Sequence, residues 1–265
     1  MTQPTFTDQD IFELHYIPQG FTPEEWRARV ELTLCYRLID YYGWTAQVYN
    51  HISLRIPGTD HLLINGFGFL YNEIRPNNLV KIDMEGNPVE PTPYPVNKAG
   101  LMIHTAIHQA REDIACVIHT HDIDCQAVCA IEEGFIPLTQ ESCQFYERIG
   151  YHEFEGIVLD SSEKERLINA LGDTNHTLML HNHGVITAGP SACWALVRMY
   201  QLVRACKVQV RAMSMGTLKH PKESAVIKTR HQFEGGDAQA GANVRHPEWQ
   251  AYFRLMTQVD PNWYK

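Results

Sequence analysis

The sequence contains no long apolar run, no excess of positive charge and no basic cluster. No run approaches the roughly 20 apolar residues that a membrane-spanning helix requires. The formal net charge is -9, with 22 Lys and Arg residues against 31 Asp and Glu residues, which does not suit a nucleic-acid-binding surface. The first residues carry neither the positive charges nor the apolar stretch of a secretory signal. We therefore expect a cytoplasmic protein that binds neither membranes nor nucleic acid.

Cysteine is present, but in no pattern typical of disulfides or a zinc finger. The seven cysteines are odd in number and scattered, mostly inside apolar periodic segments. Cys125 and Cys129 lie one helical turn apart, yet no second pair completes a metal-binding spacing. This distribution indicates reduced thiols in the core of a cytoplasmic protein. Internal repeats are absent too, and 265 residues suffice for one large domain with a sizeable core.

Helices and strands are predicted to alternate irregularly. The first helix begins at Thr22-Pro23-Glu24-Glu25, which combines an N-cap, a proline at the first helical position and a capping-box acid, and it ends at Gly43. Short apolar or alternating runs predict strands at Asn50–Ile56, Leu62–Ile64, Leu79–Asp83, Ile114–Ile118 and Thr177–Leu180. Helical spacing or capping predicts helices at Lys98–Ala110, Asp122–Ile131, residues 161–172, Ser191–Met215 and Pro247–Met256. Because several strand pairs are hairpins, we expect a mixed sheet with helices on both faces.

Three segments are less regular or open to two interpretations. Residues 1–21 are polar and are expected to form a surface arm. Residues 216–246 are Gly-rich and charged, which predicts a flexible or draped segment. The long helix predicted over Ser191–Met215 repeats apolar residues at spacings of three and four, a pattern that suits either core packing or a subunit interface.

Two histidine-containing stretches stand at the ends of apolar runs. His119 and His121 are one residue apart after Ile114–Ile118, and His183 follows Thr177–Leu180. Because residues i and i+2 of a strand point to the same face, the first two imidazoles can aim at one point, and His183 can add a third from a neighbouring strand. Three neutral imidazoles around an open position suit Zn2+, Fe2+ or Co2+. The alternative is that these are hydrogen-bonded structural histidines.

Several motifs together resemble one known family. The combination of Gly43-Trp44-Thr45, Asn50-His51-Ile52-Ser53, His119-Thr120-His121 and His183-Gly184 is similar to that of the class II aldolase/adducin family. The middle looks most like the head domain of adducins, on the motifs Asn72-Glu73-Ile74, Asn97-Lys98-Ala99-Gly100, His104-Thr105-Ala106-Ile107-His108, Tyr151-His152-Glu153-Phe154-Glu155-Gly156 and His181-Asn182-His183-Gly184-Val185-Ile186. The resemblance covers residues 22–216, which we expect to form one domain between the arm, residues 1–21, and a C-terminal extension with a short helix, residues 217–265.

This resemblance implies an architecture and a metal site. The expected fold is α/β, a three-layer α/β/α domain around a mixed, largely antiparallel sheet. The resemblance also implies a homo-oligomer, commonly a tetramer with active sites at subunit boundaries, and a zinc-like metal held by three histidines. Carried over residue by residue, the ligands are His119, His121 and His183, because the family ligand is the histidine immediately before the glycine and not His181.

Two departures from the sugar-phosphate aldolases of the family concern the substrate. Those enzymes carry a Ser-Ser-Glu tripeptide whose serines bind phosphate and whose glutamate is the acid/base, and here the aligned stretch is Lys98-Ala99-Gly100. Their phosphate-binding loop is replaced by Asn65-Gly66-Phe67-Gly68, and only Asn50 matches a phosphate-binding position. We expect substrate contacts from Asn50, His51, Asn65, Gly66 and Lys98. A standard phospho-sugar aldolase is not expected.

The acid/base must then come from elsewhere in the chain. Glu141 follows Ile136-Pro137, where the aldolases place a catalytic tyrosine, and Tyr146 lies close by in sequence, so both are candidates for catalysis. A carboxylate at Glu141 could also be a fourth metal ligand, or could simply cap or pair within its own helix. His51 and His104 could reach the site as well. His104 matches a histidine of the aldolases, although helix packing would explain it equally well.

Two classes of function follow. The first is a metal-dependent lyase, in which the metal polarises a carbonyl during retro-aldol cleavage or decarboxylation. Phe67, Phe69 and Tyr71 suggest an uncharged or aromatic small-molecule substrate, and a non-haem iron oxygenase is a variant of this hypothesis. The second is a non-catalytic, adducin-like binding domain of the actin or cytoskeleton type. The complete histidine set, with no long basic tail in this sequence, favours the enzyme.

Overall fold

One mixed sheet organises the protein. The computed structural model describes residues 17–156, 162–240 and 247–265, and these form a seven-stranded sheet in the order β3-β2-β1-β4-β7-β6-β5. The strands are β1 (His51–Arg55), β2 (Leu62–Asn65), β3 (Leu79–Ile82), β4 (Cys116–Thr120), β5 (Ile149–His152), β6 (Thr177–Leu180) and β7 (Gly184–Gly189). All neighbours pair antiparallel except β5 and β6, which are parallel. The mixed, largely antiparallel sheet predicted from the sequence is confirmed.

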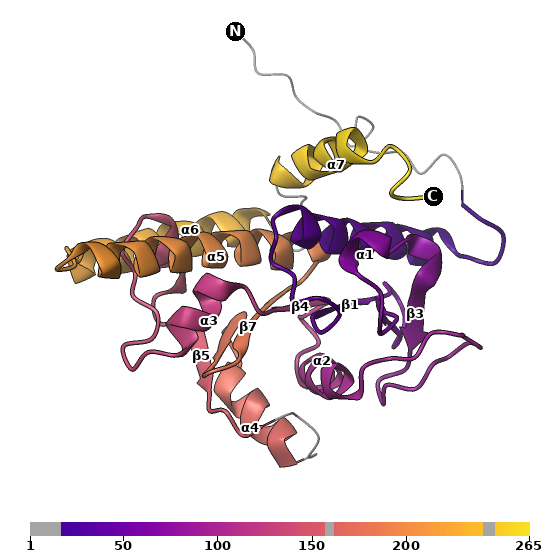
Figure 1. Ribbon diagram of the computed structural model, residues 1–265, viewed down its shortest axis with the longest axis horizontal. Coiled ribbons are helices and arrows are strands. Elements are labelled where there is room, and N and C mark those ends of the chain that lie inside the picture. The colour runs from indigo at the N-terminus through magenta and orange to yellow at the C-terminus, as the bar shows by residue number, and fades with distance from the viewer. Residues whose placement is uncertain (1–16, 157–161, 241–246) are drawn as a thin grey trace, which may run out of the picture.

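Helices cover both faces of this sheet (Figure 1). On one face lie α1 (Pro23–Tyr41), α3 (Ile123–Cys129) and α5 (Ala192–Met215); on the other lie α2 (Lys98–Ala110) and α4 (Ser162–Leu171). The helix α7 (Pro247–Val259) packs on α1, on the side away from the sheet. The three-layer α/β/α prediction is therefore confirmed as well.

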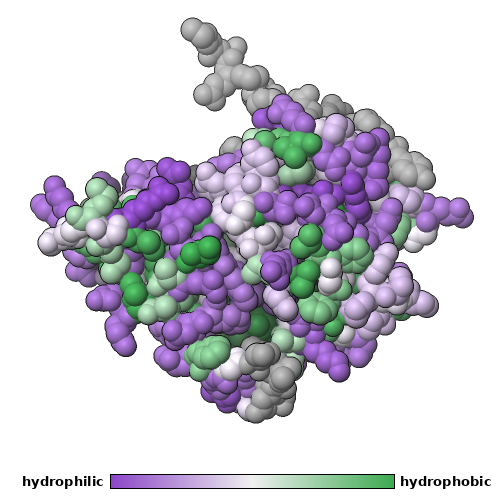
Figure 2. Space-filling model, viewed as in Figure 1, coloured by the Kyte–Doolittle hydropathy of each residue, from purple (hydrophilic) through white to green (hydrophobic). Residues whose placement is uncertain are grey.

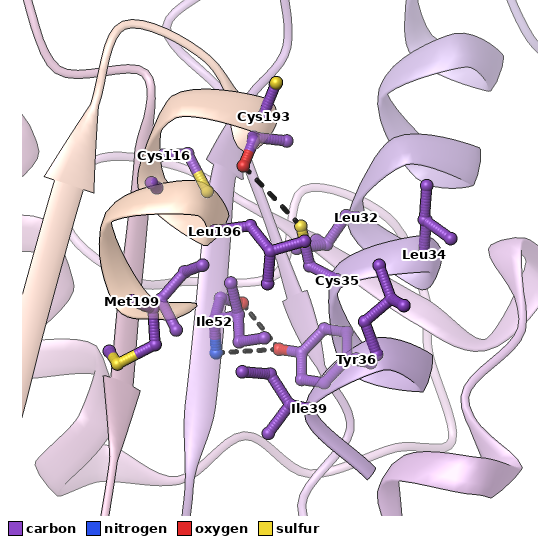
Figure 3. Close-up of a cluster of buried hydrophobic side chains, with 14 of the residues drawn as sticks. Leu32, Leu34, Cys35, Tyr36, Ile39, Ile52, Cys116, Cys193, Leu196 and Met199 are labelled. Atoms are coloured by element: carbon purple, nitrogen blue, oxygen red, sulfur yellow. Dashed lines mark hydrogen bonds between the residues drawn. The ribbon is translucent and has the colours of Figure 1, made fainter. Parts of the chain in front are cut away.

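The main hydrophobic core lies between the sheet and the helices α1 and α5. Figure 3 shows Ile39 of α1, Ile52 of β1 and Leu196 of α5 meeting there, each fully buried. The Tyr36 hydroxyl accepts hydrogen bonds from the backbone N–H groups of Ile52, at 2.9 Å, and Asn65, at 3.1 Å. Because Ile52 follows His51 in β1, this buried hydroxyl fixes the strand from behind while the opposite face remains free for polar side chains.

Helix boundaries follow the capping signals. The Thr22 side chain accepts a hydrogen bond from the Glu25 N–H at 3.2 Å, and Pro23 opens α1 as predicted. Asn97 caps α2 through the Ala99 N–H, and Asp122 caps α3 through two backbone N–H groups. The helix expected around Glu141 is a 3-10 helix, η4 (Glu141–Phe145). Two further 3-10 turns, η2 (Tyr71–Glu73) and η3 (Pro76–Asn78), precede β3.

The prediction of a flexible or draped segment over residues 216–246 was wrong for most of its length. Residues Glu223–Ala240 form a regular helix, α6, which packs against η4. Val226 is buried, and Arg230 is nearly buried where it pairs with Glu147 and approaches the Tyr146 carbonyl. These tertiary contacts offset the roughly 1 kcal/mol that each glycine costs in a helix, which is why the Gly-rich composition misled.

Two strands, β5 and β7, were not predicted as separate elements. All six residues of β7 are buried, so it shows no alternation of polar and apolar residues. The strand β5 is short and contains Gly150, against which the α4 backbone packs closely. Most of the N-terminal arm predicted over residues 1–21, and Ser161 at the start of the predicted helix 161–172, lie outside the described residues.

The surface is mainly hydrophilic on the face shown in Figure 2, with apolar side chains gathered where α5 meets α6. Most of α5 is buried as predicted, but Met213 is 38% exposed and Met215 is 86% exposed at its end. None of the helices described here combines the length and apolarity needed to cross a membrane. All seven cysteines are buried and none of them forms a disulfide among the described residues, in agreement with core packing.

Candidate metal centre

Three imidazoles converge where β4 ends and β7 begins. Among the described residues, His119, His121 and His183 offer nitrogen atoms that all lie within 4.8 Å of one another. The Nε2 atoms of His119 and His121 are 2.8 Å apart. Tetrahedral zinc–nitrogen bonds of about 2.0–2.1 Å place two ligand atoms roughly 3.3 Å apart. The observed separations bracket this distance, so the three side chains fit an ion of zinc's size.

The local backbone explains why these side chains meet. His119 lies in β4 and His121 just beyond it, so the two residues leave the strand toward the same face. His183 comes from the turn between β6 and β7, which reverses through Asn182 with a left-handed φ of 54°. Gln126 of α3 donates a hydrogen bond from Nε2 to the His183 carbonyl oxygen at 2.8 Å and so anchors the turn.

Gly184 permits the close approach of the turn to β4. A Cβ atom at this position would lie 2.6 Å from the Thr120 carbonyl oxygen and 2.9 Å from Cδ2 of His121. Real Cβ atoms do not tolerate such distances, and no flexible side-chain end is available to move away from the first of them. The glycine after His183 is therefore a steric requirement of this histidine cluster.

Burial keeps the cluster uncharged. Desolvation holds the pKa of His119 well below its usual value, lowers the pKa of His183 to about 4 and also lowers that of His121. The neighbouring imidazoles add to the effect at His119 and His183, because two positive charges in contact repel. Neutral imidazoles need to release no proton before they bind a metal, so the cluster is ready to coordinate an ion at neutral pH.

The tautomer of His119 is fixed from behind the cluster. Its Nδ1 atom lies 3.0 Å from the carbonyl oxygen of Val185, which can only accept a hydrogen bond. The proton of the neutral ring therefore sits on Nδ1, and the Nε2 lone pair faces His121. This is the arrangement that metal-binding histidines use, with a backbone carbonyl orienting the ring.

His51 lies directly across the sheet from the cluster. In the antiparallel pairing of β1 with β4, His51 is the partner of His119, and the two rings stack with centroids 4.9 Å apart. Asn50 is buried beside them: its Oδ1 atom accepts a hydrogen bond from the Ala46 N–H at 2.7 Å, and its Nδ2 atom donates to the His119 carbonyl oxygen at 3.4 Å. The structure thus brings two of the predicted substrate contacts, Asn50 and His51, to the cluster.

A chain of buried side chains continues from His51 under β1. The Nδ1 atom of His51 lies 2.8 Å from Nε2 of His104, whose Nδ1 atom lies 2.5 Å from Oγ of Ser53. The same Oγ lies 2.8 Å from Nε2 of His108, and Nδ1 of His108 lies 3.2 Å from the Ile114 carbonyl oxygen. All four side chains are buried. Sequence analysis placed His104 near the site but missed the roles of Ser53 and His108.

Comparison with known proteins identifies the family. The family model "Class II Aldolase and Adducin N-terminal domain" matches residues 30–210. The chain is 41% identical over 243 residues to a Caulobacter vibrioides protein of aldolase class 2, whose own name marks that assignment as unproven; the match covers 90% of this chain and 92% of that one. The chain belongs to the class II aldolase and adducin family. The resemblance seen in the sequence is confirmed.

Other members of the family relate this chain to both of its branches. The rat (Rattus norvegicus) alpha-adducin is 38% identical over 189 residues, which are 70% of this chain but 26% of the adducin. The crystal structure of an aldolase II superfamily protein from Pseudomonas syringae superposes with a TM-score of 0.84 at 40% identity, covering 92% of this chain and 97% of that one. The structure of L-fuculose 1-phosphate aldolase from Glaciozyma antarctica gives a TM-score of 0.79 at 25% identity, covering 94% and 97%.

Within this class II aldolase and adducin fold, the three remaining predicted substrate contacts differ in how accessible they are. Asn65 is buried and committed to the Tyr36 hydroxyl at 2.9 Å. Gly66 lies under aromatic side chains, since a Cβ there would meet Tyr94 at 2.8 Å. Lys98 is exposed at the first turn of α2. The loop that would cradle a phosphate is thus closed by an aromatic ring and a buried amide.

Glu141 lies in η4 and Tyr146 just after it, and the contacts of both residues are with side chains outside the three-histidine cluster. The Tyr146 hydroxyl donates a hydrogen bond to Oε1 of Glu223 in α6 at 2.9 Å, and this pairing raises the pKa of Tyr146. The Glu141 carbonyl accepts a hydrogen bond from Nε2 of Gln144. Within the described part of the chain, no hydrogen bond or ring contact joins Glu141 or Tyr146 to the three histidines.

Ser53 and His108 had a signal in the sequence that could have revealed them. Ser53 stands two residues after His51 on a strand, so both point to one face. His104 and His108 stand one helical turn apart, so both point to one side of a helix. Buried polar side chains need hydrogen-bond partners. A strand with two polar residues on one face and a helix with two on one side can supply such partners to each other.

Proposed function

We propose that this chain is a metal-dependent, lyase-like enzyme that cleaves a carbon–carbon bond in a small carbonyl substrate, by aldol-type cleavage or decarboxylation. The observation that carries the proposal is the cluster of three neutral imidazoles with nitrogen atoms within 4.8 Å of one another. Membership of the class II aldolase and adducin family supports it, as does the 25% identity to an L-fuculose 1-phosphate aldolase over nearly the whole chain.

In this proposal His119, His121 and His183 hold Zn2+, with Fe2+ or Co2+ as the other ions that three imidazoles accept. When bound, such an ion supplies Lewis-acid polarisation of the substrate carbonyl, which stabilises the negative charge left by cleavage. The chain's own residues orient the ligands: Val185 fixes the His119 ring, and Gln126 fixes the turn that carries His183. Buried surroundings strengthen every electrostatic interaction at such a centre.

The proposed substrate is a small carbonyl compound and not a standard sugar phosphate. The Asn65 side chain is hydrogen-bonded to Tyr36, and Gly66 lies against Tyr94, so neither residue is open to bind a phosphate group. Asn50 and His51 beside the cluster and Lys98 at the exposed start of α2 are the groups we propose for substrate contact. The pair of Tyr49 and Phe67, with ring centroids 6.3 Å apart and both partly exposed, suits an apolar or aromatic portion of the substrate.

We also propose that the protein acts in the cytoplasm as a homotetramer in which Glu141 and Tyr146 serve the centre of a neighbouring chain. Ile123 supports a subunit interface beside the cluster, because this apolar residue is 81% exposed in the single chain and stands two residues after His121. Sedimentation velocity should give the mass of four chains. Introducing a charge with Ile123→Glu should shift the protein to smaller species, while Val259→Glu, at another exposed apolar residue, should leave the assembly intact.

Elemental analysis of gently purified protein tests the metal assignment. We expect about one zinc, iron or cobalt ion per chain, and we expect a His119→Ala, His121→Ala double variant to lose it while circular dichroism shows an intact fold. Iron in place of zinc would bring forward oxygenase chemistry on the same fold. Full metal retention in the double variant, or no metal in the parent after reconstitution, would contradict the proposal.

An adducin-like binding domain is the second candidate function, and the 38% identity to alpha-adducin favours it. In that case the chain would bind filamentous actin without a metal and without catalysis. Co-sedimentation with actin filaments, with the double histidine variant alongside, separates the two functions. Actin binding by both proteins together with an empty metal centre would replace the lyase proposal, whereas bound metal and no co-sedimentation would support it.

A further inference from the structure

We propose that His51 presents a fixed hydrogen-bond acceptor to the candidate metal centre, and that His104, Ser53 and His108 are positioning residues that set its tautomer. The acceptor is the Nε2 lone pair of His51. Its partner would be a hydroxyl group of the carbonyl substrate or a water molecule, and this use rests on the proposed lyase function. The tautomer itself follows from the chain's hydrogen bonds and is independent of that function.

The first step of the argument is a matter of volume at position 100. A Cβ atom on Gly100 would lie 2.4 Å from Cδ2 and 2.7 Å from Nε2 of His51. Gly100 is not one of the residues with a left-handed backbone, so conformational strain does not call for glycine here. The imidazole of His51 therefore occupies the space in which any side chain at position 100 would begin. This is the position where the resemblance to the aldolases leads to the expectation of a carboxylate.

The second step is the direction of each hydrogen bond in the buried chain. The Ile114 carbonyl can only accept, so the proton of neutral His108 sits on Nδ1, and its Nε2 atom must accept from the Ser53 hydroxyl. The Ser53 oxygen then accepts from Nδ1–H of His104. The Nε2 atom of His104 is left as an acceptor for Nδ1–H of His51. One carbonyl oxygen thus determines the tautomers of three rings.

The opposite direction is excluded by the same carbonyl. If His51 carried its proton on Nε2, then His104 would have to donate from Nε2 and accept at Nδ1, so Ser53 would donate to His104. The Ser53 oxygen would then need the proton of His108 on Nε2, which would leave the Nδ1 lone pair of that ring facing the Ile114 carbonyl at 3.2 Å. Two facing lone pairs in a buried site are costly. Charging His104 or His108 would relieve the conflict, but burial holds the pKa of His104 well below its usual value and lowers that of His108 to about 3.

The third step concerns the free end of the chain. Within the described part of the structure, Nε2 of His51 makes no hydrogen bond, although only 5% of the residue's surface is exposed. The ring stacks on His119, one of the three clustered histidines, and its free nitrogen lies next to Gly100 in the first turn of α2. A carboxylate accepts hydrogen bonds and donates none, and the Nε2 atom of this tautomer does the same. His51 supplies in this chain an acceptor that Gly100 cannot provide.

The test is the tautomer of each ring, read from long-range proton–nitrogen correlations of the chain labelled with 15N-histidine. The measurement uses the full-length protein at pH 7.5, once stripped of metal by a chelator and once loaded with zinc. We expect His51, His104 and His108 each to show a protonated Nδ1 and a bare Nε2 in both samples. A protonated Nε2 on His51 in the parent protein would overturn the proposal, whatever the metal content.

Ser53→Ala interrupts the hydrogen-bond chain between His104 and His108. Ser142→Ala is its matched control, since Ser142 is equally buried but, among the described residues, hydrogen-bonds only to Thr139. We expect the first variant to convert His51 and His104 into a mixture of tautomers and the second to leave them unchanged. Ser53→Thr keeps the hydroxyl and should restore the single tautomer. Unchanged His51 signals in Ser53→Ala would show that the buried chain does not set the tautomer.

A steric cycle checks the volume argument without relying on the tautomer signals. Gly100→Ala alone should lower the melting temperature, whereas Gly100→Ala on a His51→Ala background should not, because the added methyl group then enters vacated space. An equal loss in both backgrounds would mean that His51 does not fill position 100. Failure of the lyase proposal would appear separately, as absent zinc in a protein whose His51 still shows the bare Nε2 atom.

Discussion

Tyr36 and Tyr71 meet edge to face in the core, with ring centroids 4.6 Å apart and ring planes at 89°. Both side chains are fully buried. The Tyr36 hydroxyl bonds to the backbone of Ile52 and to the backbone and side chain of Asn65. The Tyr71 hydroxyl has no hydrogen-bond partner among the described residues. Of the two buried hydroxyl groups, only that of Tyr36 makes hydrogen bonds with described residues.

This difference predicts opposite outcomes for one substitution. Tyr36→Phe leaves buried polar groups of Ile52 and Asn65 without a partner, so it should lower the free energy of unfolding by about 1–3 kcal/mol. Tyr71→Phe removes a buried hydroxyl that makes no hydrogen bond with any described residue, so it should be neutral or slightly stabilising. Urea denaturation of both variants measures the two changes. Equal losses would contradict the assignment of Tyr36 as the polar anchor of β1 and β2.

Gly184→Ala should damage the metal centre and the fold together. The added Cβ would press on the Thr120 carbonyl and on His121, and overpacking of this kind costs about 1–3 kcal/mol. Gly235→Ala is the control, because Gly235 is exposed within α6 and has open space around it. That variant should gain up to about 1 kcal/mol from helix propensity. Thermal unfolding and metal content of both proteins check the expectation.

His183→Ala and His181→Ala distinguish the ligand from its near neighbour. His181 stacks on Tyr151 and approaches Glu153 instead of joining the cluster. We expect His183→Ala to lower zinc affinity by at least the 10-fold to 100-fold that even a supporting residue contributes, since it removes a direct ligand. His181→Ala should retain zinc. Competition with a chromogenic chelator measures both affinities, and a reversed order would move the ligand assignment to His181.

Acid should destabilise the protein through His108. Burial, with Arg55 of β1 adding positive charge, lowers the pKa of His108 to about 3, against about 6.5 in the unfolded chain. His104 faces it through Ser53 from the same helix. Between these pH values the unfolded state binds the proton and the folded state does not. The free energy of unfolding should therefore fall below about pH 6.5, by up to ~1.4 kcal/mol per pH unit for this group.

His108→Gln removes this titrating group and serves to measure its share. We expect the urea midpoint of the parent protein to fall between pH 7.5 and pH 5.5, and the fall in the variant to be smaller. Other buried histidines, among them His51 and His104, keep part of the pH dependence in the variant. Identical pH dependence in the two proteins would show that His108 is not buried in its neutral form.

Local signals predicted much of the fold. The cap at Thr22 and the helix Lys98–Ala110 follow from nearest neighbours in sequence, and the structure reproduces them. The strand β7 and the helix α6 were not predicted, because they are stabilised by contacts with residues far away in the sequence. A fully buried strand shows no alternation, and α6, which contains two glycines, packs against η4 from a distant part of the sequence.

The candidate site divides in the same way. The spacing of His119 and His121 on a strand predicted that two imidazoles lie together, and the resemblance to the family, whose ligand precedes a glycine, selected His183 over His181. The interlock of Gly100 with His51 could not be read from the sequence, because the two residues come from α2 and β1 and meet only in the folded chain. The register that sets His51 opposite His119 is likewise a property of the assembled sheet.

The strand that carries His119 has its two neighbours far away along the chain. Asn50, next to β1, donates a hydrogen bond to the His119 carbonyl from 69 residues before it, and the Val185 carbonyl of β7 accepts a hydrogen bond from the His119 ring from 66 residues after it. Contacts of such long range form late, because both loops must close first. During synthesis the three imidazoles cannot meet until Val185 has left the ribosome. Capture of an ion would therefore require the pairing of β4 with β7, and a chain that ended before His183 would lack one of the three proposed ligands.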